Sequence, residues 1–311
     1  MRYDSILDLI GNTPLVALHP LSPSPSVRIW GKLESQNPGG SVKDRIALEM
    51  VEDAERRGVL NPGDTILEPS SGNTGIGLAL VARLRGYRLR VVLPENVSVE
   101  RRQILEIFGA EVTPSPADEG SNGAIRVAEK LAADDPTLVM LFQYGNPANA
   151  AAHYKTTGPE ILRDCPEVDV FVAGLGTSGT LMGVGRYLKE HKPGVQVVAV
   201  EPPAGELVQG LRSLEDGFVP PIFDPDLLDR KFIVRPRESI EWTRRLLDDC
   251  GVFSGISAGA VVAGAAKMAA TMDAGTIVTL IPDGGWKYLS SGAWTDDIDV
   301  VEERARRINY W

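Results

Sequence analysis

The sequence predicts an α/β fold with mostly parallel sheets, because strand-like and helix-like segments alternate along it. Short apolar runs typical of buried strands recur at residues 27–33, 65–67, 89–93, 139–142, 168–173, 195–200 and 276–281. Helical patterns separate most of them, for example at residues 46–57, 99–108 and 124–133. Strands that alternate with helices form βαβ units, whose parallel sheets are covered by helices on both faces.

The composition is that of a globular protein, with 311 residues, 43 % hydrophobic content and 24 % charge. No apolar run is long enough to cross a bilayer, and the N-terminus carries Asp4 and Asp8 instead of a signal peptide. We therefore expect a cytoplasmic protein with no membrane partner. The formal net charge of -10 argues against nucleic acid as a partner, because phosphate backbones require a basic face.

The sequence predicts no metal site. Its two cysteines, Cys165 and Cys250, lack metal-ligand spacing and a neighbouring histidine, so we interpret them as structural thiols in a reducing compartment. The three histidines are scattered along the chain, and we expect ordinary structural or surface roles for them. Acid–base chemistry would then fall mostly to Lys43.

Lys43 follows a Pro-Gly-Gly turn in the segment NPGGSVKDR (residues 37–45), where an extended run gives way to a helical pattern. A lysine fixed there can form an imine with an aldehyde cofactor. The usual pKa of a lysine amine, about 10.4, must be overcome by burial or by imine formation. The alternative is a solvated lysine at a helix start, and two further loops argue against it.

The second loop, EPSSGNTG (residues 68–75), joins a strand-like run to the helical pattern at residues 76–84. A glycine-rich turn before a helix directs backbone N–H groups at an anion, and Ser71, Asn73 and Thr74 add short donors. This combination suits a carboxylate or the phenolic oxygen of a pyridine ring. Helix capping by Ser or Asn is the alternative, but it explains one polar residue and not a run of four.

The third loop, GLGTSGT (residues 174–180), follows a strand-like run and opens a helix that extends to about His191. Its glycines, hydroxyls and helix N-terminus suit a phosphate. The same residues match the Gly-x-Gly-x-x-Gly dinucleotide fingerprint, with Glu201 at the end of the next strand. An NAD-binding oxidoreductase is thus an alternative from another class, although it leaves the first two loops unexplained.

Together these segments resemble the fold-type II pyridoxal-phosphate enzymes, specifically the cysteine synthase and cystathionine β-synthase family. The resemblance covers nearly the whole chain, from IGNTPL (residues 10–15) to GISAGA (residues 255–260) and WKYLS (residues 286–290). It implies that Lys43 holds pyridoxal 5'-phosphate and that Asn73 meets its ring oxygen. It also implies that its phosphate is bound by Gly176, Thr177, Ser178, Gly179 and Thr180. A catalytically silent regulatory partner is disfavoured, because Lys43 and Asn73 are both intact.

The resemblance further implies two domains, a reaction and a homodimer. Residues 1–41 and 150–311 would form the larger, cofactor-binding domain, and residues 42–149 a smaller, mobile substrate-binding domain. The ligand would lie between them at the carboxyl ends of strands. Lys43 would remove the α-proton of an amino acid, the β-substituent would leave to give an aminoacrylate, and a sulfur nucleophile would add to it.

Matching family residues predict the substrate site and the partner of the pyridine nitrogen. The substrate carboxylate would be held by Ser70, Ser71, Asn73, Thr74 and Gln143, the last placed at the end of a predicted strand. Ser257 is the candidate for the pyridine nitrogen. Asp283 is its rival and would protonate the ring, although a turn aspartate before two glycines is an equally good interpretation.

Arg212 in the loop QGLRSLEDGFVP (residues 209–220) predicts the leaving group. A guanidinium binds a phosphate bidentately, and the resemblance to O-phosphoserine sulfhydrylases, which carry an arginine there, favours O-phospho-L-serine over O-acetylserine. The alternative is a surface arginine paired with Glu215 or Asp216. Sulfide or a small thiocarboxylated carrier protein would donate the sulfur, and residues 308–311 are similar to terminal segments that close such a site.

Overall fold

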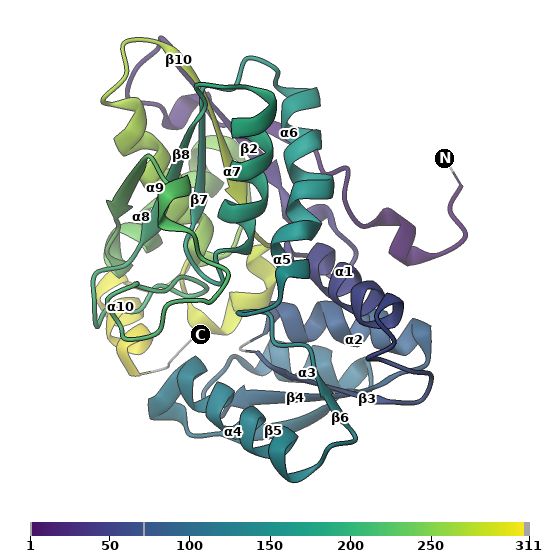
Figure 1. Ribbon diagram of the computed structural model, residues 1–311. Helices are drawn as coiled ribbons and strands as arrows, with labels where there is room; N and C mark the ends of the chain where they lie inside the picture. Colours follow the sequence, from purple (N-terminus) through teal and green to yellow (C-terminus); the bar gives the residue numbers. More distant parts are fainter. Residues whose placement is uncertain (1, 71, 308–311) are drawn as a thin grey trace.

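The computed structural model describes residues 2–70 and 72–307, which fold around two separate sheets (Figure 1). The larger sheet has the order β1-β2-β10-β7-β8-β9, and every neighbouring pair in it is parallel except β1 and β2. Its strands are β1 (Leu15–Ala17), β2 (Val27–Leu33), β7 (Val170–Gly174), β8 (Gln196–Glu201), β9 (Arg230–Ile233) and β10 (Gly275–Ile281).

The smaller sheet has the order β5-β4-β3-β6 and is parallel throughout. Its strands are β3 (Thr65–Pro69), β4 (Arg88–Pro94), β5 (Glu111–Ser115) and β6 (Leu138–Met140). All four lie within residues 42–149, and all six strands of the larger sheet lie outside them. This arrangement agrees with the predicted α/β class, whereas the domain division with its mobile part stays a prediction.

Helices cover both faces of each sheet, as expected for parallel strands. They are α1 (Lys43–Arg56), α2 (Asn73–Arg85), α3 (Val99–Ile107), α4 (Gly120–Asp134), α5 (Pro147–Ala152), α6 (Gly158–Asp164), α7 (Gly179–His191), α8 (Pro236–Cys250), α9 (Ile256–Ala269) and α10 (Ile298–Arg307). Val170 and Val172 of β7 pack into the core that contains α9, and Phe171 and Ala173 into the core that contains α7. No helix in the described ranges is both long and apolar enough to cross a membrane.

Helix α9 is buried on all sides, and small residues make its position possible. Every residue of the helix except Lys267 is buried. A Cβ atom on Gly259 would stand 2.1 Å from the Ser239 carbonyl oxygen, and one on Gly264 would stand 2.3 Å from the Val200 side chain. The GISAGA motif therefore begins a helix that fits tightly between α8 and the larger sheet.

Each of the seven predicted strands corresponds to a strand in the structure, with ends that differ by at most two residues, and one of these differences bears on the site. The sequence predicts a strand through residue 142, whereas β6 ends at Met140 and Phe142 has a φ of 56°, in the left-handed region. Gln143 consequently lies in a turn beyond the strand. Three strands were not predicted, β1, β5 and β9, and all three lie at sheet edges.

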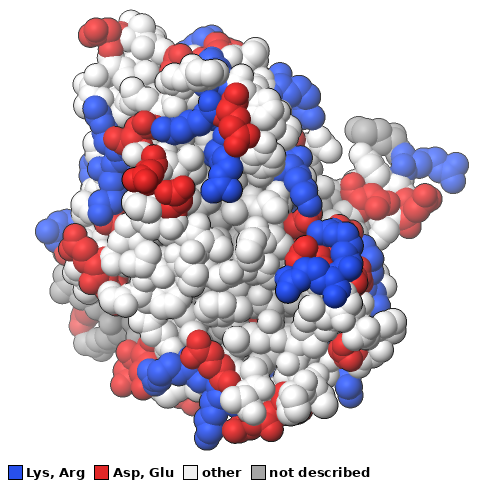
Figure 2. Space-filling view, viewed as in Figure 1, with Lys and Arg blue, Asp and Glu red and all other residues white. Residues whose placement is uncertain are grey.

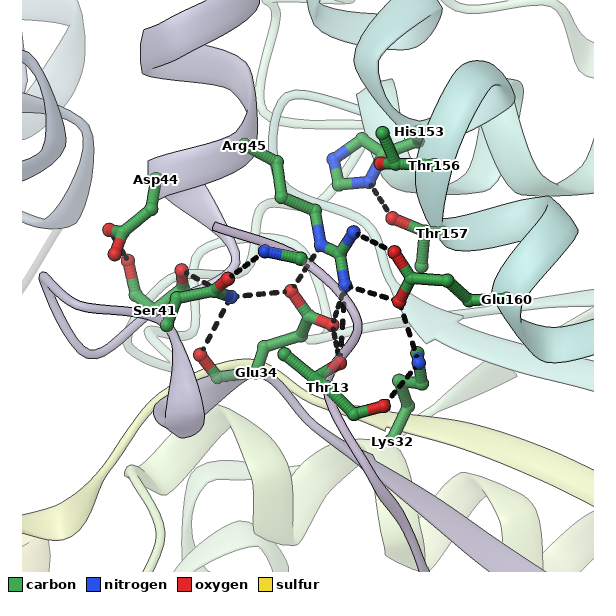
Figure 3. Close-up of polar contacts among 12 residues, drawn as sticks. Thr13, Lys32, Glu34, Ser41, Asp44, Arg45, His153, Thr156, Thr157 and Glu160 are labelled. Atoms are coloured by element: carbon green, nitrogen blue, oxygen red, sulfur yellow. Dashed lines mark hydrogen bonds and ion pairs between the residues drawn. The ribbon is translucent and has the colours of Figure 1, made fainter. Parts of the chain in front are cut away.

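A buried ion cluster fixes the start of α1 (Figure 3). The Arg45 guanidinium donates to both oxygens of Glu34, with Nε to Oε2 at 2.7 Å and Nη2 to Oε1 at 2.9 Å. It also donates to both oxygens of Glu160, at 2.7 and 2.8 Å, and Lys32 donates to Glu160 at 2.7 Å. Burial would raise the pKa of Glu160, but the bonds from Arg45 and Lys32 lower it to about 2. Two cations and two anions thus neutralise one another in the interior.

We predict that Arg45→Met strongly destabilises the fold, because it leaves two buried carboxylates with only Lys32 to balance them. Loss of one partner from a buried ion pair costs about 3–5 kcal/mol. Chemical unfolding followed by circular dichroism would measure the change. Arg56→Met is the matched control on the same helix: Arg56 pairs with Glu49 and Asp53 at the surface, so little change is expected. Equal effects of the two substitutions would contradict the prediction.

Candidate active site

A single cavity brings together every predicted site residue that the structure describes. Its lining includes Lys43, Ser70, Asn73, Thr74, Gln143, Gly176, Thr177, Ser178, Gly179, Thr180, Arg212 and Ser257. These residues come from both the 42–149 segment and the rest of the chain, and many follow the carboxyl ends of strands, where α/β folds bind ligands. Two predictions fall outside the described residues, namely Ser71 and the terminal segment 308–311.

The cavity is electropositive. Among the described residues that line it, Lys43, Arg101 and Arg212 are cationic and none is acidic. Serine and threonine hydroxyls and the N-terminus of α7 add further donors. This set of groups fits a ligand with several negative charges, such as a phosphate ester that also carries a carboxylate.

Lys43 lines the cavity and is the first residue of α1, which begins three residues before the helical pattern predicted from the sequence. Burial lowers the pKa of Lys43, and the negative charges of Asp283 and Glu34 partly oppose that effect. The preceding turn requires Gly40, which has a φ of 76° and whose Cβ, if present, would stand 2.5 Å from the Trp286 ring. The turn thus places at the start of α1 a buried amine that loses its proton more easily than an exposed lysine does.

The loop after β3 is held by its own side chains. Ser70 Oγ accepts from the N–H groups of Gly72, at 3.2 Å, and Gly75, at 3.1 Å. Ser70 therefore stabilises the start of α2. Helix capping of this kind was the alternative interpretation of the loop from the sequence. Thr74 Oγ1 donates to Gln143 Oε1 at 2.6 Å, which joins the two side chains across the cavity wall.

Glu68 anchors the turn that carries Gln143, a role that no pattern in the sequence predicts. Its side chain is fully buried at the carboxyl end of β3. Oε2 accepts from the Phe142 N–H at 2.8 Å and Oε1 from the Gln143 N–H at 3.0 Å. Burial raises the pKa of Glu68 to about 8, despite these two backbone bonds. The left-handed conformation of Phe142 is thus supported by one carboxyl group.

The loop GLGTSGT (residues 174–180) has glycines where neighbouring groups approach its backbone closely. A Cβ atom on Gly176 would stand 2.7 Å from the Gly210 carbonyl oxygen, and one on Gly179 would stand 1.9 Å from Asn149 Oδ1. Asn149 Nδ2 donates to the Gln143 carbonyl at 2.8 Å and to Thr177 Oγ1 at 2.9 Å. Asn149, which the sequence analysis missed, therefore connects this loop to the Gln143 turn.

A histidine supports the same loop from behind. His153 is buried, with Nε2 3.2 Å from Thr180 Oγ1 and Nδ1 2.9 Å from Thr157 Oγ1. Burial lowers the pKa of His153 well below its usual value, so the ring is neutral at pH 7. The expected structural role of this histidine agrees with these contacts.

The two candidates for the pyridine nitrogen differ in their positions. Ser257 is the second residue of α9 and lines the cavity. Asp283 lies behind the wall, where its Oδ2 accepts from Asn73 Nδ2 at 2.7 Å and from the Tyr288 hydroxyl. Asp283 is 1 % exposed and is absent from the described residues that line the cavity, so the geometry favours Ser257.

Arg212 is buried, so the surface alternative for it is wrong. The side chain is 6 % exposed and its guanidinium carbon lies 4.6 Å from the Phe218 ring centre and 5.3 Å from that of Tyr144. Nη1 donates to Asn122 Oδ1 at 3.1 Å, which connects the loop to α4. A guanidinium has five N–H groups, so donors remain for an anion in the cavity.

Known proteins with similar sequences are pyridoxal-phosphate dependent enzymes. Residues 6–283 match the family model described as pyridoxal-phosphate dependent enzyme. A cysteine synthase of Staphylococcus aureus is 42 % identical over 304 residues, which cover 94 % of this chain and 98 % of that protein. A protein of Pseudomonas aeruginosa named cysteine synthase B is 41 % identical over 295 residues, with the same coverage.

Solved structures give the same result. An O-ureido-L-serine synthase superposes with a TM-score of 0.89 at 40 % identity, over 96 % of this chain and 97 % of that one. A cysteine synthase of Entamoeba histolytica superposes with a TM-score of 0.89 at 35 % identity, over 97 % and 95 % of the two chains.

The fold and the cavity define a class of enzyme whose site combines a buried lysine with donors that suit an anionic cofactor. The chain belongs to the family of pyridoxal-phosphate dependent enzymes, in its fold-type II, cysteine synthase branch. It is an enzyme of the β-replacement type, and its cofactor is pyridoxal 5'-phosphate. The glycine fingerprint at residues 174–179 is therefore part of a pyridoxal-phosphate enzyme, and the NAD interpretation is set aside.

We predict that Glu68→Gln changes how stability depends on pH. The pKa of Glu68 rises from 4.5 to about 8 on folding, so the folded state binds an extra proton between these values. This group therefore stabilises the fold at low pH, and the contribution is lost as the pH rises through about 8. Glutamine cannot ionise, so the free energy of unfolding of the variant, relative to the parent, should increase across that window.

Denaturant unfolding at several pH values would measure this difference. Glu106→Gln on the exposed face of α3 is the control, and its difference from the parent should not change with pH over the same window. A constant difference for Glu68→Gln as well would show that the Glu68 carboxyl does not titrate there.

Proposed function

We propose that this chain is a cysteine synthase that prefers O-phospho-L-serine, releases phosphate from the β-carbon and adds sulfur to form L-cysteine. The observation that carries the proposal is the buried guanidinium of Arg212 in the lining of an electropositive cavity. Two curated relatives at 41–42 % identity bear the name cysteine synthase, which supports the reaction type.

The residues in the cavity are suited to hold the cofactor. In our proposal Gly176, Thr177, Ser178, Gly179 and Thr180 bind its phosphate, Lys43 its aldehyde carbon, Asn73 its ring oxygen and Ser257 its ring nitrogen. The bound cofactor supplies an electron sink for the carbon from which a proton is removed. A hydroxyl at the ring nitrogen leaves that nitrogen largely unprotonated, which favours elimination.

Lys43 moves the proton in this proposal. Its burial favours the neutral amine, which can accept the α-proton of the substrate. Thr74, Gln143, Asn73 and Ser70, with Ser71, hold the substrate carboxylate, supported by the N-terminus of α2 and by the Glu68 carboxyl behind Gln143. The carboxylate site and the leaving-group site then lie on different walls of one cavity.

Arg212 selects the leaving group. Stacking on Phe218 and the bond to Asn122 restrict the guanidinium before any ligand arrives, so little side-chain entropy is lost on binding. Negative charge increases on the phosphate oxygens as the bond to the β-carbon breaks, and a fixed cation stabilises that charge. An acetyl leaving group gains less from such a contact.

We predict that Arg212→Ala lowers kcat/KM for O-phosphoserine roughly ten- to a hundredfold, the value of a charge-assisted hydrogen bond, and affects O-acetylserine much less. Steady-state assays with both substrates would measure the ratio. Thr74→Val is the matched control: both substrates carry the same carboxylate, so it should reduce both by similar factors.

Equal losses with both substrates in Arg212→Ala, at full cofactor content, would show that Arg212 is not the selector. A strong preference of the parent enzyme for O-acetylserine would overturn the phosphoserine proposal and favour an O-acetylserine sulfhydrylase. For the sulfur donor we propose sulfide or a small thiocarboxylated carrier protein, supported by the family resemblance. For the location we propose the cytoplasm, supported by the composition of the chain.

We also propose a homodimer, supported by two surfaces of the chain. The segment that contains the 3₁₀ turn Ile6–Leu9 extends away from the body (Figure 1), and Tyr3, Ile6 and Leu9 on it are 51 %, 44 % and 39 % exposed. A groove between α5, α7 and residues 221–222 lies on a face with an uncharged centre (Figure 2). The groove is lined mainly by uncharged residues, among them Ala150, Ala151, Met182, Pro221 and Ile222.

Sedimentation velocity would test the homodimer. We expect a dimer that Ile6→Asp weakens, because an exposed apolar side chain at a subunit contact would be replaced by a charge. Val300→Asp, at an equally exposed position on α10, should leave the assembly unchanged. A monomeric parent protein at micromolar concentration would contradict the proposal.

A further inference from the structure

The amide of Asn73 is held at both ends by buried charged groups. Its Nδ2 donates to Asp283 Oδ2 at 2.7 Å, and its Oδ1 accepts from Lys287 Nζ at 2.8 Å. Asp283 is 1 % exposed and Lys287 is fully buried. Both groups lie in the segment 282–290. From the sequence, Asp283 was only the rival of Ser257, and Lys287 only a member of the family motif WKYLS.

The chemistry of these neighbours permits one orientation of the amide. An ionised carboxylate only accepts hydrogen bonds, and an ammonium group only donates them. A flipped amide would place its oxygen against the carboxylate of Asp283 and its NH₂ group against the ammonium of Lys287. Each mismatch leaves a buried polar group without a partner, which is costly. The orientation is therefore fixed by the charges of Asp283 and Lys287.

The fixed orientation decides what Asn73 offers to the cavity that it lines. Nδ2 carries two hydrogens, and Asp283 uses one of them, so a donor remains. Oδ1 is directed at Lys287. Asn73 can therefore donate to an acceptor such as an aromatic oxygen, and an oxygen of that kind is what the cofactor presents.

Lys287 also connects this amide to the turn before the lysine that holds the cofactor. Its Nζ donates to the carbonyl oxygens of Gly39 at 2.9 Å and Gly40 at 3.2 Å. Burial lowers the pKa of Lys287 to about 8, and the charges of Asp283 and Asp44 oppose this effect. One buried ammonium thus contacts both segments, the 39–40 turn and the start of α2.

We propose that Asp283 and Lys287 are positioning residues that hold the Asn73 amide with its N–H edge toward the cofactor. The inference rests on the proposed contact between Asn73 and the ring oxygen. It gives Asp283 a role behind the wall, in place of a contact with the pyridine nitrogen.

A double-mutant cycle on cofactor affinity tests the proposal. The variants are Asn73→Ala, Lys287→Met and the pair, each purified as holoenzyme and dialysed to equilibrium against pyridoxal 5'-phosphate. Bound cofactor is measured by its visible absorption and by phosphate content. We expect each single substitution to weaken binding roughly tenfold, the value of one hydrogen bond to a charged group, and the pair to weaken it hardly more than Asn73→Ala alone.

Two controls separate positioning from general damage. Arg244→Met removes a different, partly buried cation that donates to two backbone carbonyl oxygens, those of Ala293 at 2.7 Å and Asp296 at 2.6 Å, away from the described cavity lining. It should lower thermal stability without changing cofactor affinity. If Lys287→Met does not fold, Asp283→Asn, which is nearly isosteric and can both donate and accept, replaces it in the same cycle with the same expected coupling.

If the double variant loses cofactor affinity by the product of the two single factors, the inference is overturned, because Lys287 would then act independently of Asn73. Unchanged affinity in Asn73→Ala alone would instead overturn the proposed contact of Asn73, and the inference with it. The band position of the bound cofactor gives a second readout: it should shift alike in Asn73→Ala and Lys287→Met and should not shift in Arg244→Met.

Discussion

The site depends on the buried guanidinium of Arg45, two residues after Lys43. It binds Glu34, which directly follows β2, and Glu160 on α6. The first turn of α1 is thereby attached to a strand of the larger sheet and to a helix packed beside that sheet. The same helix packs into the core of the smaller sheet through Ile46, Ala47 and Met50. Helix α1 therefore belongs to both halves of the molecule, and its first residue lies where they meet. The lysine at this position, catalytic in our proposal, therefore begins a helix that is held by four buried charged groups.

The acidic groups near the site lie behind its walls. Glu68 holds a backbone turn, Asp283 holds an amide, and Glu34 holds Arg45, while the cavity itself presents cations and N–H groups. Each carboxylate thereby fixes a donor without competing with an anionic ligand for it. Coulomb interactions extend farther than hydrogen bonds, so Asp283 and Glu34 still favour the protonated form of Lys43. The local potential is thus set by groups that touch no ligand in our proposal.

Prediction from the sequence succeeded where one local pattern determines the structure. Central strands that are buried on both faces give nearly continuous apolar runs, so β7, β8 and β10 were found. The strands that were missed, β1, β5 and β9, lie at edges, are short and expose part of their residues, and so lack such a run. The three loops of the site were found because glycine and hydroxyl residues are adjacent in each of them.

Contacts between distant residues could not be predicted in this way. Phe142 has a left-handed backbone because Glu68, 74 residues earlier, accepts its N–H group. Asn73 meets Asp283 across 210 residues and Lys287 across 214. No spacing rule connects such positions. The resemblance indicated the residues that meet ligands in our proposal, whereas the groups that support those residues are seen only in the folded structure.

The tight fit of α9 restricts how this scaffold can change. Where a helix has no room for even one additional carbon at two of its glycines, a larger side chain cannot be absorbed by local repacking. The same helix presents Ser257 to the cavity from its first turn. A library of variants that aims to alter the chemistry at residue 257, the partner of the ring nitrogen in our proposal, should therefore hold the interior of α9 constant.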